Sequence, residues 1–231
     1  MTLYERGNAA KQWIFTELEK RLQNQEFQVL DMACGDGSKW PRFLETHVLV
    51  SVVGIDTDAT AIARGQHAHA RLMLRVADAQ QPIAEGSFQA VTAFSAMEHV
   101  VDHAALLKTV WDALAAGGVA YLNYDVGHFR SWNVKERLMV PVSQLLARMG
   151  IEGSYMKQVN DARFRAQAEA QGFRVTGFRK HNLHPLKGFC RGASEDAVRA
   201  WYAFEEELGR LYAPEALDCV MWSTTLVLQK P

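Results

Sequence analysis

The residues from 27 to 41 constrain the fold of this chain more than any others. An apolar run, Phe27 to Leu30, is typical of a buried strand, and a loop with Gly35 and Gly37 follows it. Ser38 is predicted to cap a helix that starts after the loop. The glycines allow a sharp turn and the close approach of a ligand, and the helix N-terminus favours an anionic group. Taken alone, the stretch is also compatible with a turn that serves packing only.

A second apolar run, Ser51 to Ile55, ends in Asp56, about 20 residues beyond the glycines. In nucleotide-binding α/β folds an acidic residue at this distance accepts hydrogen bonds from ribose hydroxyls. The dinucleotide fingerprint also needs a third small residue three positions after the second glycine, and Trp40 stands there. Its bulk would prevent the close helix–strand packing that the third glycine serves, which argues against a nicotinamide cofactor.

Further short motifs follow in order along the chain. The full series is Val29-Leu30-Asp31-Met32-Ala33-Cys34-Gly35-Asp36-Gly37, Val53-Gly54-Ile55-Asp56, Ala77-Asp78-Ala79, Phe88-Gln89-Ala90-Val91 with Glu98-His99-Val100, and Leu114-Ala115-Ala116-Gly117-Gly118. In order and spacing the series resembles the class I S-adenosylmethionine-dependent methyltransferases over nearly the whole chain. The resemblance is closest to the small-molecule, type 11-like branch, in which a Glu-His-Val run follows the fourth strand. Ala33 departs from the many members with glycine there, and its small size predicts no loss of binding.

The predicted elements fit the fold that this resemblance implies. The strands are expected at 27–30, 51–55, 72–76, 88–94, 119–124, 173–179 and 219–228, and the helices at 9–23, 38–46, 59–70, 102–116, 134–149, 161–171 and 195–212. The fold is a Rossmann-like, doubly wound α/β sheet of seven strands, the last antiparallel, with helices on both faces. Residues 1–231 are expected to form a single methyltransferase domain, with an N-terminal helical lid at 1–24 and a cap insertion after the fifth strand at 126–160.

The resemblance implies S-adenosyl-L-methionine as cofactor and S-adenosyl-L-homocysteine as product. The residues expected to bind it are Asp31, Ala33, Cys34, Gly35, Gly37, Asp56, Thr57, Asp78, Ala79 and Ser95. Those from Asp31 to Gly37 would contact the methionine part, and Asp56 would accept from both ribose hydroxyls. Thr57 would lie against the adenine, and Asp78 and Ala79 would bind its amino group and a ring nitrogen. Two alternatives stay open: Asp56 as a solvent-facing acid at a strand end, and Asp78 as a turn residue.

Methyl transfer from a sulfonium donor depends on holding the donor and the nucleophile in line and on excluding water. A hydroxyl or ammonium acceptor needs a base, and His99 is the candidate, because imidazole titrates near neutral pH. The alternative is that Glu98 and His99 only brace their loop. The acceptor is expected among Tyr4, Tyr124, His128, Trp132 and Tyr155, although aromatic residues near a cap often serve packing alone.

The composition of the chain limits the classes of partner that it is expected to bind. The formal charge of −1 gives no general attraction to nucleic acid, although basic and aromatic residues in 126–160 leave such contact as a minor alternative. No 18-residue apolar run appears, and Cys34, Cys190 and Cys219 are too scattered for a disulfide framework or a zinc site. We therefore expect a cytoplasmic monomer or homodimer that binds no metal, membrane or nucleic acid.

The sequence thus predicts an enzyme that methylates an oxygen, nitrogen or carbon atom of a small molecule. The alternative from another class is a non-catalytic S-adenosylmethionine-binding or interaction protein on the same fold. RNA or protein methylation is disfavoured, because Phe94-Ser95-Ala96-Met97 is unlike the Asn-Pro-Pro-Tyr-type motif that such enzymes carry after the fourth strand.

Overall fold

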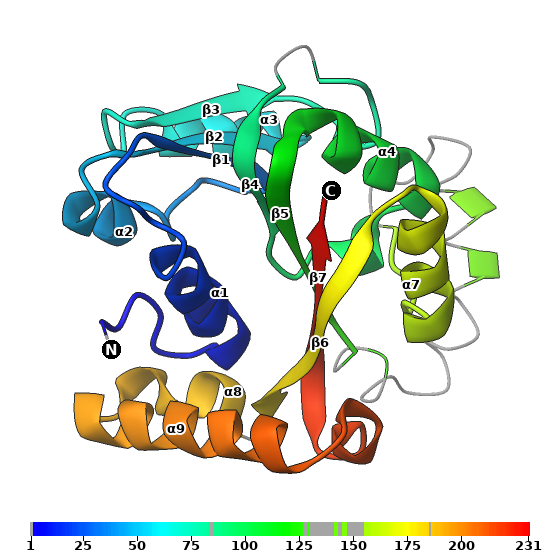
Figure 1. Cartoon of the computed structure of the whole chain (residues 1–231). Coiled ribbons are helices and arrows are strands. Elements are labelled where there is room, and N and C mark those ends of the chain that lie inside the picture. The colour runs from blue at the N-terminus through cyan, green and yellow to red at the C-terminus, as the bar shows by residue number, and fades with distance from the viewer. Residues whose placement is uncertain are drawn as a thin grey trace.

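The computed structural model describes residues 2–83, 86–126, 129, 141–142, 145–146, 155–184 and 186–231. The strands within these ranges form one seven-stranded sheet in the order β3-β2-β1-β4-β5-β7-β6 (Figure 1). They are β1 Phe27–Met32, β2 Val50–Asp56, β3 Leu72–Val76, β4 Phe88–Ala93, β5 Leu114–Asp125, β6 Arg174–Leu183 and β7 Met221–Gln229. Neighbours pair in parallel except β7, which is antiparallel to both β5 and β6. The predicted fold class, with its antiparallel last strand, is confirmed.

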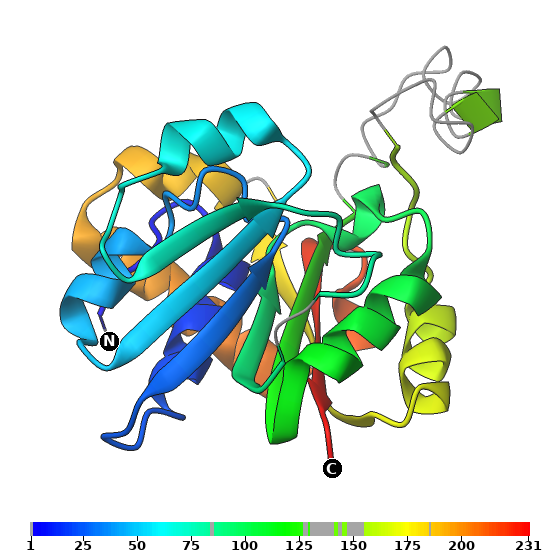
Figure 2. The ribbon, with the colours of Figure 1, turned by 90° about the horizontal axis from the view of Figure 1, so that it is seen from above.

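Helices cover both faces of this sheet (Figure 1, Figure 2). They are α1 Ala9–Glu19, α2 Pro41–Thr46, α3 Ala59–Gly65, α4 His103–Ala113, α7 Asp161–Ala170, α8 Leu186–Phe189 and α9 Glu195–Leu211, with the 3-10 turns η1 Met97–His99, η2 Cys190–Gly192 and η3 Pro214–Leu217. One apolar core joins the sheet to α4 and α7 through residues such as Leu107 and Phe164. A second joins it to α1, α2 and α3 through residues such as Phe15, Phe43 and Ile62. A third, smaller core packs α9 on the N-terminal segment through residues such as Leu3 and Trp201. Each helix in these ranges is too short or too polar to cross a bilayer.

The parallel strands bring the candidate site together. β1 is buried at every position except Gln28, as expected for a central strand covered on both faces. Asp31 pairs in register with Gly54 of β2 and Thr92 of β4, so these strands end at the same level. The loops that follow β1, β2, β3 and β4 therefore meet at one edge of the sheet, where ligands bind in open α/β sheets.

Several predicted boundaries differ from the structure, and two of these differences depend on loop chemistry. Ser38 does not cap the helix after the glycine loop: α2 starts at Pro41, and the Ser38 N–H instead donates to Asp36 Oδ1 (3.1 Å). Gly117 and Gly118 do not end a helix but lie inside β5, because α4 ends at Ala113. Gly117 has a φ of +74°, beside an irregularity in the β4–β5 pairing, a conformation that glycine adopts readily.

The remaining predictions differ in their outcome. Asp58 and Ser194 cap α3 and α9 through their side chains, as predicted. β6 extends to Leu183, beyond its predicted end at 179. The predicted cap helix at 134–149 lies outside the described residues, apart from 141–142 and 145–146.

Candidate cofactor and acceptor site

The loops at the carboxyl edge enclose a hollow of about 130 Å³. Its lining residues are Ala33, Asp56, Thr57, Ala77, Asp78, Ala79, Gln80, Ala96, His99 and Val100. They come from the loops after β1, β2, β3 and β4, and they include most of the residues predicted to bind the adenosine part. Separate sequence motifs are thus brought to one place.

The Asp56 carboxylate joins the glycine loop to the end of β2. Its Oδ2 accepts from the Gly35 N–H (2.8 Å) and its Oδ1 from the Asp58 N–H (2.9 Å). Since a carboxylate offers about four acceptor positions, further donors can bind the same group. Gly35 has a φ of +60°, and a Cβ there would meet no heavy atom within 4 Å. The backbone of Gly35 therefore faces open space directly beside the acid.

Two non-glycine residues at strand ends adopt left-handed backbone conformations. Ala33 has a φ of +55° and Ser95 a φ of +51°. Such a conformation costs roughly 1–2 kcal/mol outside glycine, and strained residues of this kind gather at functional sites. Ser95 is held in place by Asn123, whose Oδ1 accepts from its N–H (3.1 Å) and its hydroxyl (3.4 Å). Glycine would adopt the conformation of Ala33 without this strain.

Other residues of the predicted cofactor set face the protein interior. A Cβ at Gly37 would lie 2.9 Å from Leu72 Cδ2, so this glycine allows the loop to pack on β3. Cys34 is buried, and burial raises the pKa of its thiol. A Cβ at Gly54 would come within 2.8 Å of the Cys34 sulfur. These residues shape the loop from behind, by packing.

Asp31 is fully buried and accepts from its own neighbours. Thr92 Oγ1 donates to its Oδ1 (2.9 Å), and Trp40 Nε1 donates to its Oδ2 (2.7 Å). Lys39 Nζ lies 3.3 Å from Oδ2 and 2.8 Å from the Cys34 carbonyl oxygen. The bulky residue in the third-glycine position thus supplies a hydrogen bond to the acid. The sequence analysis missed Lys39, although a base two positions after the last glycine was a signal that it could have used.

Glu98 and His99 point in different directions from η1. Glu98 is buried, and its Oε1 accepts from the Asp125 N–H at the end of β5 (3.3 Å). His99 is exposed and lines the hollow, with Nδ1 3.1 Å from the Tyr155 carbonyl oxygen. A carbonyl can only accept, so the neutral ring carries its proton on Nδ1 and leaves the Nε2 lone pair available. Glu98 therefore stabilises the loop through its hydrogen bond to β5, and His99 carries a basic nitrogen.

A second hollow, of about 350 Å³, lies on the other side of the loop after β4. Its lining residues are Glu5, Gly7, Asn8, Lys11, Ser95, Gly188 and Arg191. Ser95 lines this hollow and its neighbour Ala96 lines the first. Glu5 Oε1 accepts from the backbone N–H groups of Arg6 and Gly7, both at 2.9 Å. No local pattern predicts this hollow, because its walls come from three distant segments.

The predicted acceptor residues are not gathered in one place. The Tyr4 hydroxyl contacts His47 Nε2 (2.8 Å) and Glu19 (3.1 Å), and burial raises its pKa to about 12. The Tyr124 hydroxyl donates to Asp161 Oδ1 (2.7 Å) on the α7 side of the sheet. Neither side chain lines either hollow. Tyr155 is buried and reaches His99 through its carbonyl, whereas His128 and Trp132 lie outside the described residues. Across the described ranges, no three His, Cys, Asp or Glu side chains converge as metal ligands would.

Comparisons with known proteins agree with this geometry. Residues 30–122 match the model of the family described as "Methyltransferase domain". Trans-aconitate 2-methyltransferase of Deinococcus radiodurans is 28% identical over 102 residues, which are 44% of this chain and 39% of that protein. The chain thus matches about two fifths of the length of this curated relative.

Solved structures share the fold over nearly the whole chain. An S-adenosylmethionine-dependent methyltransferase from Mesorhizobium loti superposes with a TM-score of 0.62 at 18% identity, covering 95% of this chain and 97% of that one. Phosphoethanolamine N-methyltransferase 2 of Haemonchus contortus, in complex with S-adenosyl-L-methionine, gives 0.58 at 17% identity, covering 96% of this chain and 56% of that one. At these identities the likeness concerns the fold. The fold is thus that of class I S-adenosylmethionine-dependent methyltransferases, and residues 30–122 resemble a methyltransferase domain in sequence.

The match to the methyltransferase domain runs from β1 into β5, where the predicted motifs lie, and covers about two fifths of the chain. The family implies S-adenosyl-L-methionine as cofactor, and the residues present fit that molecule. The open space over Gly35 and the unused acceptor positions of Asp56 suit a ribose. The ammonium group of Lys39, which is largely buried, suits an amino-acid carboxylate.

Proposed function

We propose that the protein transfers the methyl group of S-adenosyl-L-methionine to an oxygen, nitrogen or carbon nucleophile of a small molecule that carries an anionic group. The observation that supports this most is the pair of hollows on either side of Ser95 and Ala96. One has the residues expected for an adenosine, and the other is bordered by Lys11 and Arg191. A donor in the first and an acceptor in the second would meet at this loop.

The first hollow is smaller than the pockets of whole small-molecule ligands, which are roughly 300–1,000 Å³. We therefore assign it to the adenosine end, with Asp56 on the ribose and Asp78 with Ala79 on the adenine. The rest of the cofactor would extend past Gly35 toward Ser95. Lys39 would then attract the methionine carboxylate. When bound, the cofactor supplies an electrophilic methyl group and a thioether that leaves readily.

Charge supports an anionic acceptor in the second hollow. Arg191 is exposed and, among the residues described, has no ion-pair partner, while the nearby Glu5 carboxylate is bonded to backbone N–H groups. A guanidinium binds a carboxylate through two parallel hydrogen bonds, which also orients it. The relative named trans-aconitate 2-methyltransferase is similar to part of this chain, and its name specifies a carboxylated acceptor.

His99 is proposed as the proton acceptor for a hydroxyl or ammonium nucleophile. Its contact with the Tyr155 carbonyl oxygen supports the Nδ1–H tautomer, in which Nε2 is basic. The N-terminal residues 1–24 are proposed as a lid, since Glu5, Asn8 and Lys11 line the second hollow. The proposal of 126–160 as a cap rests on the sequence alone.

Two measurements test this function. Calorimetry with S-adenosyl-L-homocysteine tests the cofactor, and transfer of a labelled methyl group tests a panel that pairs carboxylates, trans-aconitate among them, with their neutral esters. We expect turnover on a carboxylate and none on its ester. In Lys11→Met and Arg191→Met variants the KM for the acceptor should rise about tenfold, whereas Lys20→Met, a lysine outside this hollow, should be normal. Equal turnover of acid and ester would refute the anionic acceptor. Cofactor binding without turnover on any member would favour the non-catalytic alternative.

A further inference from the structure

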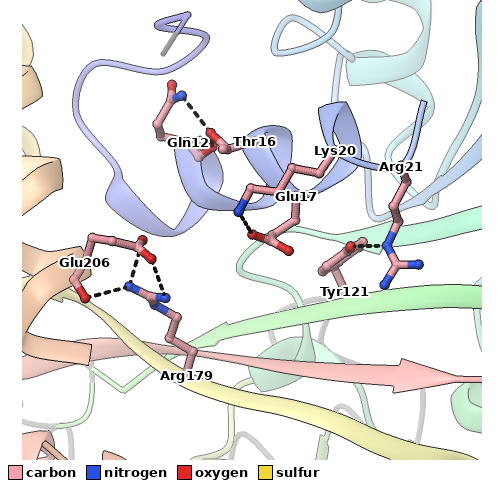
Figure 3. A network of polar contacts seen from close by, with 8 residues as sticks. All are labelled: Gln12, Thr16, Glu17, Lys20, Arg21, Tyr121, Arg179 and Glu206. Atoms are coloured by element: carbon pink, nitrogen blue, oxygen red, sulfur yellow. Dashed lines mark hydrogen bonds and ion pairs between the residues drawn. The ribbon is translucent and has the colours of Figure 1, made fainter. Parts of the chain in front are cut away.

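A third cavity lies on the α1 side of the sheet, between α1, β6 and α9, with a volume of about 440 Å³. Figure 3 shows the polar contacts of some of its lining residues, Arg179 and Glu206 among them. It is lined by Ala9, Gln12, Trp13, Thr16, Glu19, Lys20, Arg179, His181, Arg199, Tyr202, Ala203, Glu205 and Glu206. We refer to it as the α1–α9 cleft. Its volume falls within the range of small-molecule sites.

Two buried nitrogens of β6 line this cleft without hydrogen-bond partners among the described residues: Arg179 Nε and His181 Nε2. The two residues are two positions apart on the strand, so their side chains project from the same face. His181 is only 2% exposed, and burial, together with Arg179, holds the pKa of its ring well below the usual value. A buried polar nitrogen left unpaired costs roughly 1–3 kcal/mol, which a ligand oxygen at this place would recover from Arg179 Nε–H and from the Nε2–H tautomer of His181.

The basic side chains of the cleft are already paired with carboxylates. Both terminal nitrogens of Arg179 bind the Glu206 carboxylate (3.1 and 2.9 Å), and Lys20 is paired with Glu17 (2.6 Å), as Figure 3 shows. Glu205 accepts from the N–H groups of Asn182, Leu183 and Trp201. An anionic ligand would therefore lose its hydration without gaining a free counter-ion, which favours a neutral ligand over an anion.

The remaining walls are aromatic or small. The Trp13 indole lies 5.2 Å from the His181 ring and has the Arg179 guanidinium 5.3 Å from its centre. Tyr202 is held by a bond from its hydroxyl to the Glu5 carbonyl oxygen (2.8 Å), and Ala9 and Ala203 complete the lining. Rigid aromatic walls with small residues between them suit a flat ring.

We propose that the α1–α9 cleft is a second ligand site, for a small neutral molecule with a flat ring and a carbonyl or hydroxyl oxygen that accepts from Arg179 Nε and His181 Nε2. The site is separate from the methyl-transfer centre. The cleft shares no lining residue with the hollow beside Ser95 or with the hollow that contains Asp56. The reacting atoms of methyl transfer must be within about 3.5 Å of one another.

Acetophenone, cumene and benzoate test the proposal as matched probes: a ring with a carbonyl, the same shape without oxygen, and an anion. Each is titrated into the full chain and followed by amide chemical shifts and by calorimetry. We expect acetophenone to bind at least tenfold more tightly than the other two and to shift the amides of Ala9 and Ala203. Binding should be unchanged by saturating S-adenosyl-L-homocysteine.

Variants locate the hydrogen bond. His181→Phe keeps a flat ring but removes the nitrogen, and should weaken acetophenone about tenfold, to the level of cumene. His184→Phe replaces an exposed histidine directly after β6 and should leave binding unchanged. Competition with S-adenosyl-L-homocysteine, tighter binding of benzoate, or amide shifts confined to other regions would each overturn the proposal. The amide shifts of the native protein decide the matter even if His181→Phe does not fold, and none of these readouts depends on methyl transfer.

Discussion

The two halves of the sheet build their cavities in different ways. In the half formed by β3, β2, β1 and β4, the lining residues follow directly after strands, so a few short motifs supply the whole hollow. In the half formed by β5, β7 and β6, the walls come from α1, β6, α8 and α9, segments separated by more than half of the chain. The first arrangement is a consequence of parallel strands, whose carboxyl ends share one edge. The second depends on how helices pack, which no local pattern specifies.

The two halves also treat charge differently. The Asp56 carboxylate accepts hydrogen bonds from two backbone N–H groups and still has acceptor positions for a ligand. Arg179 and Glu206, in the other half, satisfy each other. Substitutions in the half with Asp56 should therefore change cofactor affinity, whereas substitutions in the half with Arg179 and Glu206 should mainly change stability.

The largest effect is expected for Asp56→Ala. The loss of a charged acceptor for two ribose hydroxyls amounts to about 1.5–3 kcal/mol, or roughly a 10- to 150-fold weaker affinity for S-adenosyl-L-homocysteine. Calorimetry measures it, with Asp36→Asn, an acid of the same loop that pairs with Arg64, as the control. An unchanged dissociation constant in a folded Asp56→Ala protein would show that the acid plays no part in binding.

Glycine substitutions should separate the halves next. A Cβ at Gly65 would lie 2.0 Å from the Asp36 carbonyl oxygen, so Gly65→Ala must displace the glycine loop, at about 1–3 kcal/mol of stability and with weaker cofactor binding. Gly188→Ala meets no atom within 4 Å, and only its φ of +80° opposes the change, by about 1 kcal/mol. Urea unfolding and cofactor titration of both variants make the comparison. Equal loss of cofactor affinity in both would contradict it.

Lys39 offers a test within the cofactor half. Because its side chain is partly exposed, Lys39→Met should weaken S-adenosyl-L-homocysteine by about 1 kcal/mol, or roughly fivefold. Lys39→Arg keeps the charge and should retain most of the affinity. If both variants bind like the native chain, the ammonium does not reach the carboxylate.

A pH dependence of stability should arise from the other half. Burial lowers the folded-state pKa of His181 below its unfolded value of 6.5. At pH values between these two pKa values the unfolded chain binds more protons than the folded one. The contribution of His181 to the free energy of unfolding is therefore complete above pH 6.5. It falls as the pH drops, by at most about 1.4 kcal/mol per pH unit. His47 and His103 shift in the same direction. Urea unfolding at pH 7.5 and 5.5 should show a smaller difference in His181→Phe than in the native chain, and an equal difference would exclude His181 as a source.

The smallest effect is a gain. Ala33→Gly removes left-handed strain of roughly 1–2 kcal/mol and adds unfolded-state entropy worth about 0.4–1 kcal/mol, so stability should rise by about 0.5 kcal/mol. The control, Ala61→Gly inside α3, should lower stability by about 1 kcal/mol. A thermal unfolding scan of the two variants is sufficient. Destabilisation by Ala33→Gly would show that the Ala33 side chain contributes contacts that outweigh the strain.

The structural features that could be predicted from the sequence are those that hydrophobic periodicity and motif spacing determine. Apolar runs predicted the strands, and acidic residues after them predicted the lining of the first hollow, because strand direction alone places both. It could not predict that Trp40 would satisfy Asp31, since an indole N–H has no local pattern. It also missed Lys11 and Arg191, which line the same hollow only after α1 and η2 have packed. Tyr4 and Tyr124 were expected near the acceptor for their aromatic character, but burial in the first two cores accounts for both.

The position of β7 has a consequence for how the sheet is completed during synthesis. β7 is the last strand in the chain order and lies between β5 and β6, which do not pair with each other. Until residues 221–229 leave the ribosome, β5 therefore has an unpaired edge and β6 has no neighbour in the sheet. Such edges attract other strands, so nascent chains halted before β7 should need a chaperone to stay unaggregated. The β3-β2-β1-β4-β5 part has no such dependence and can form first.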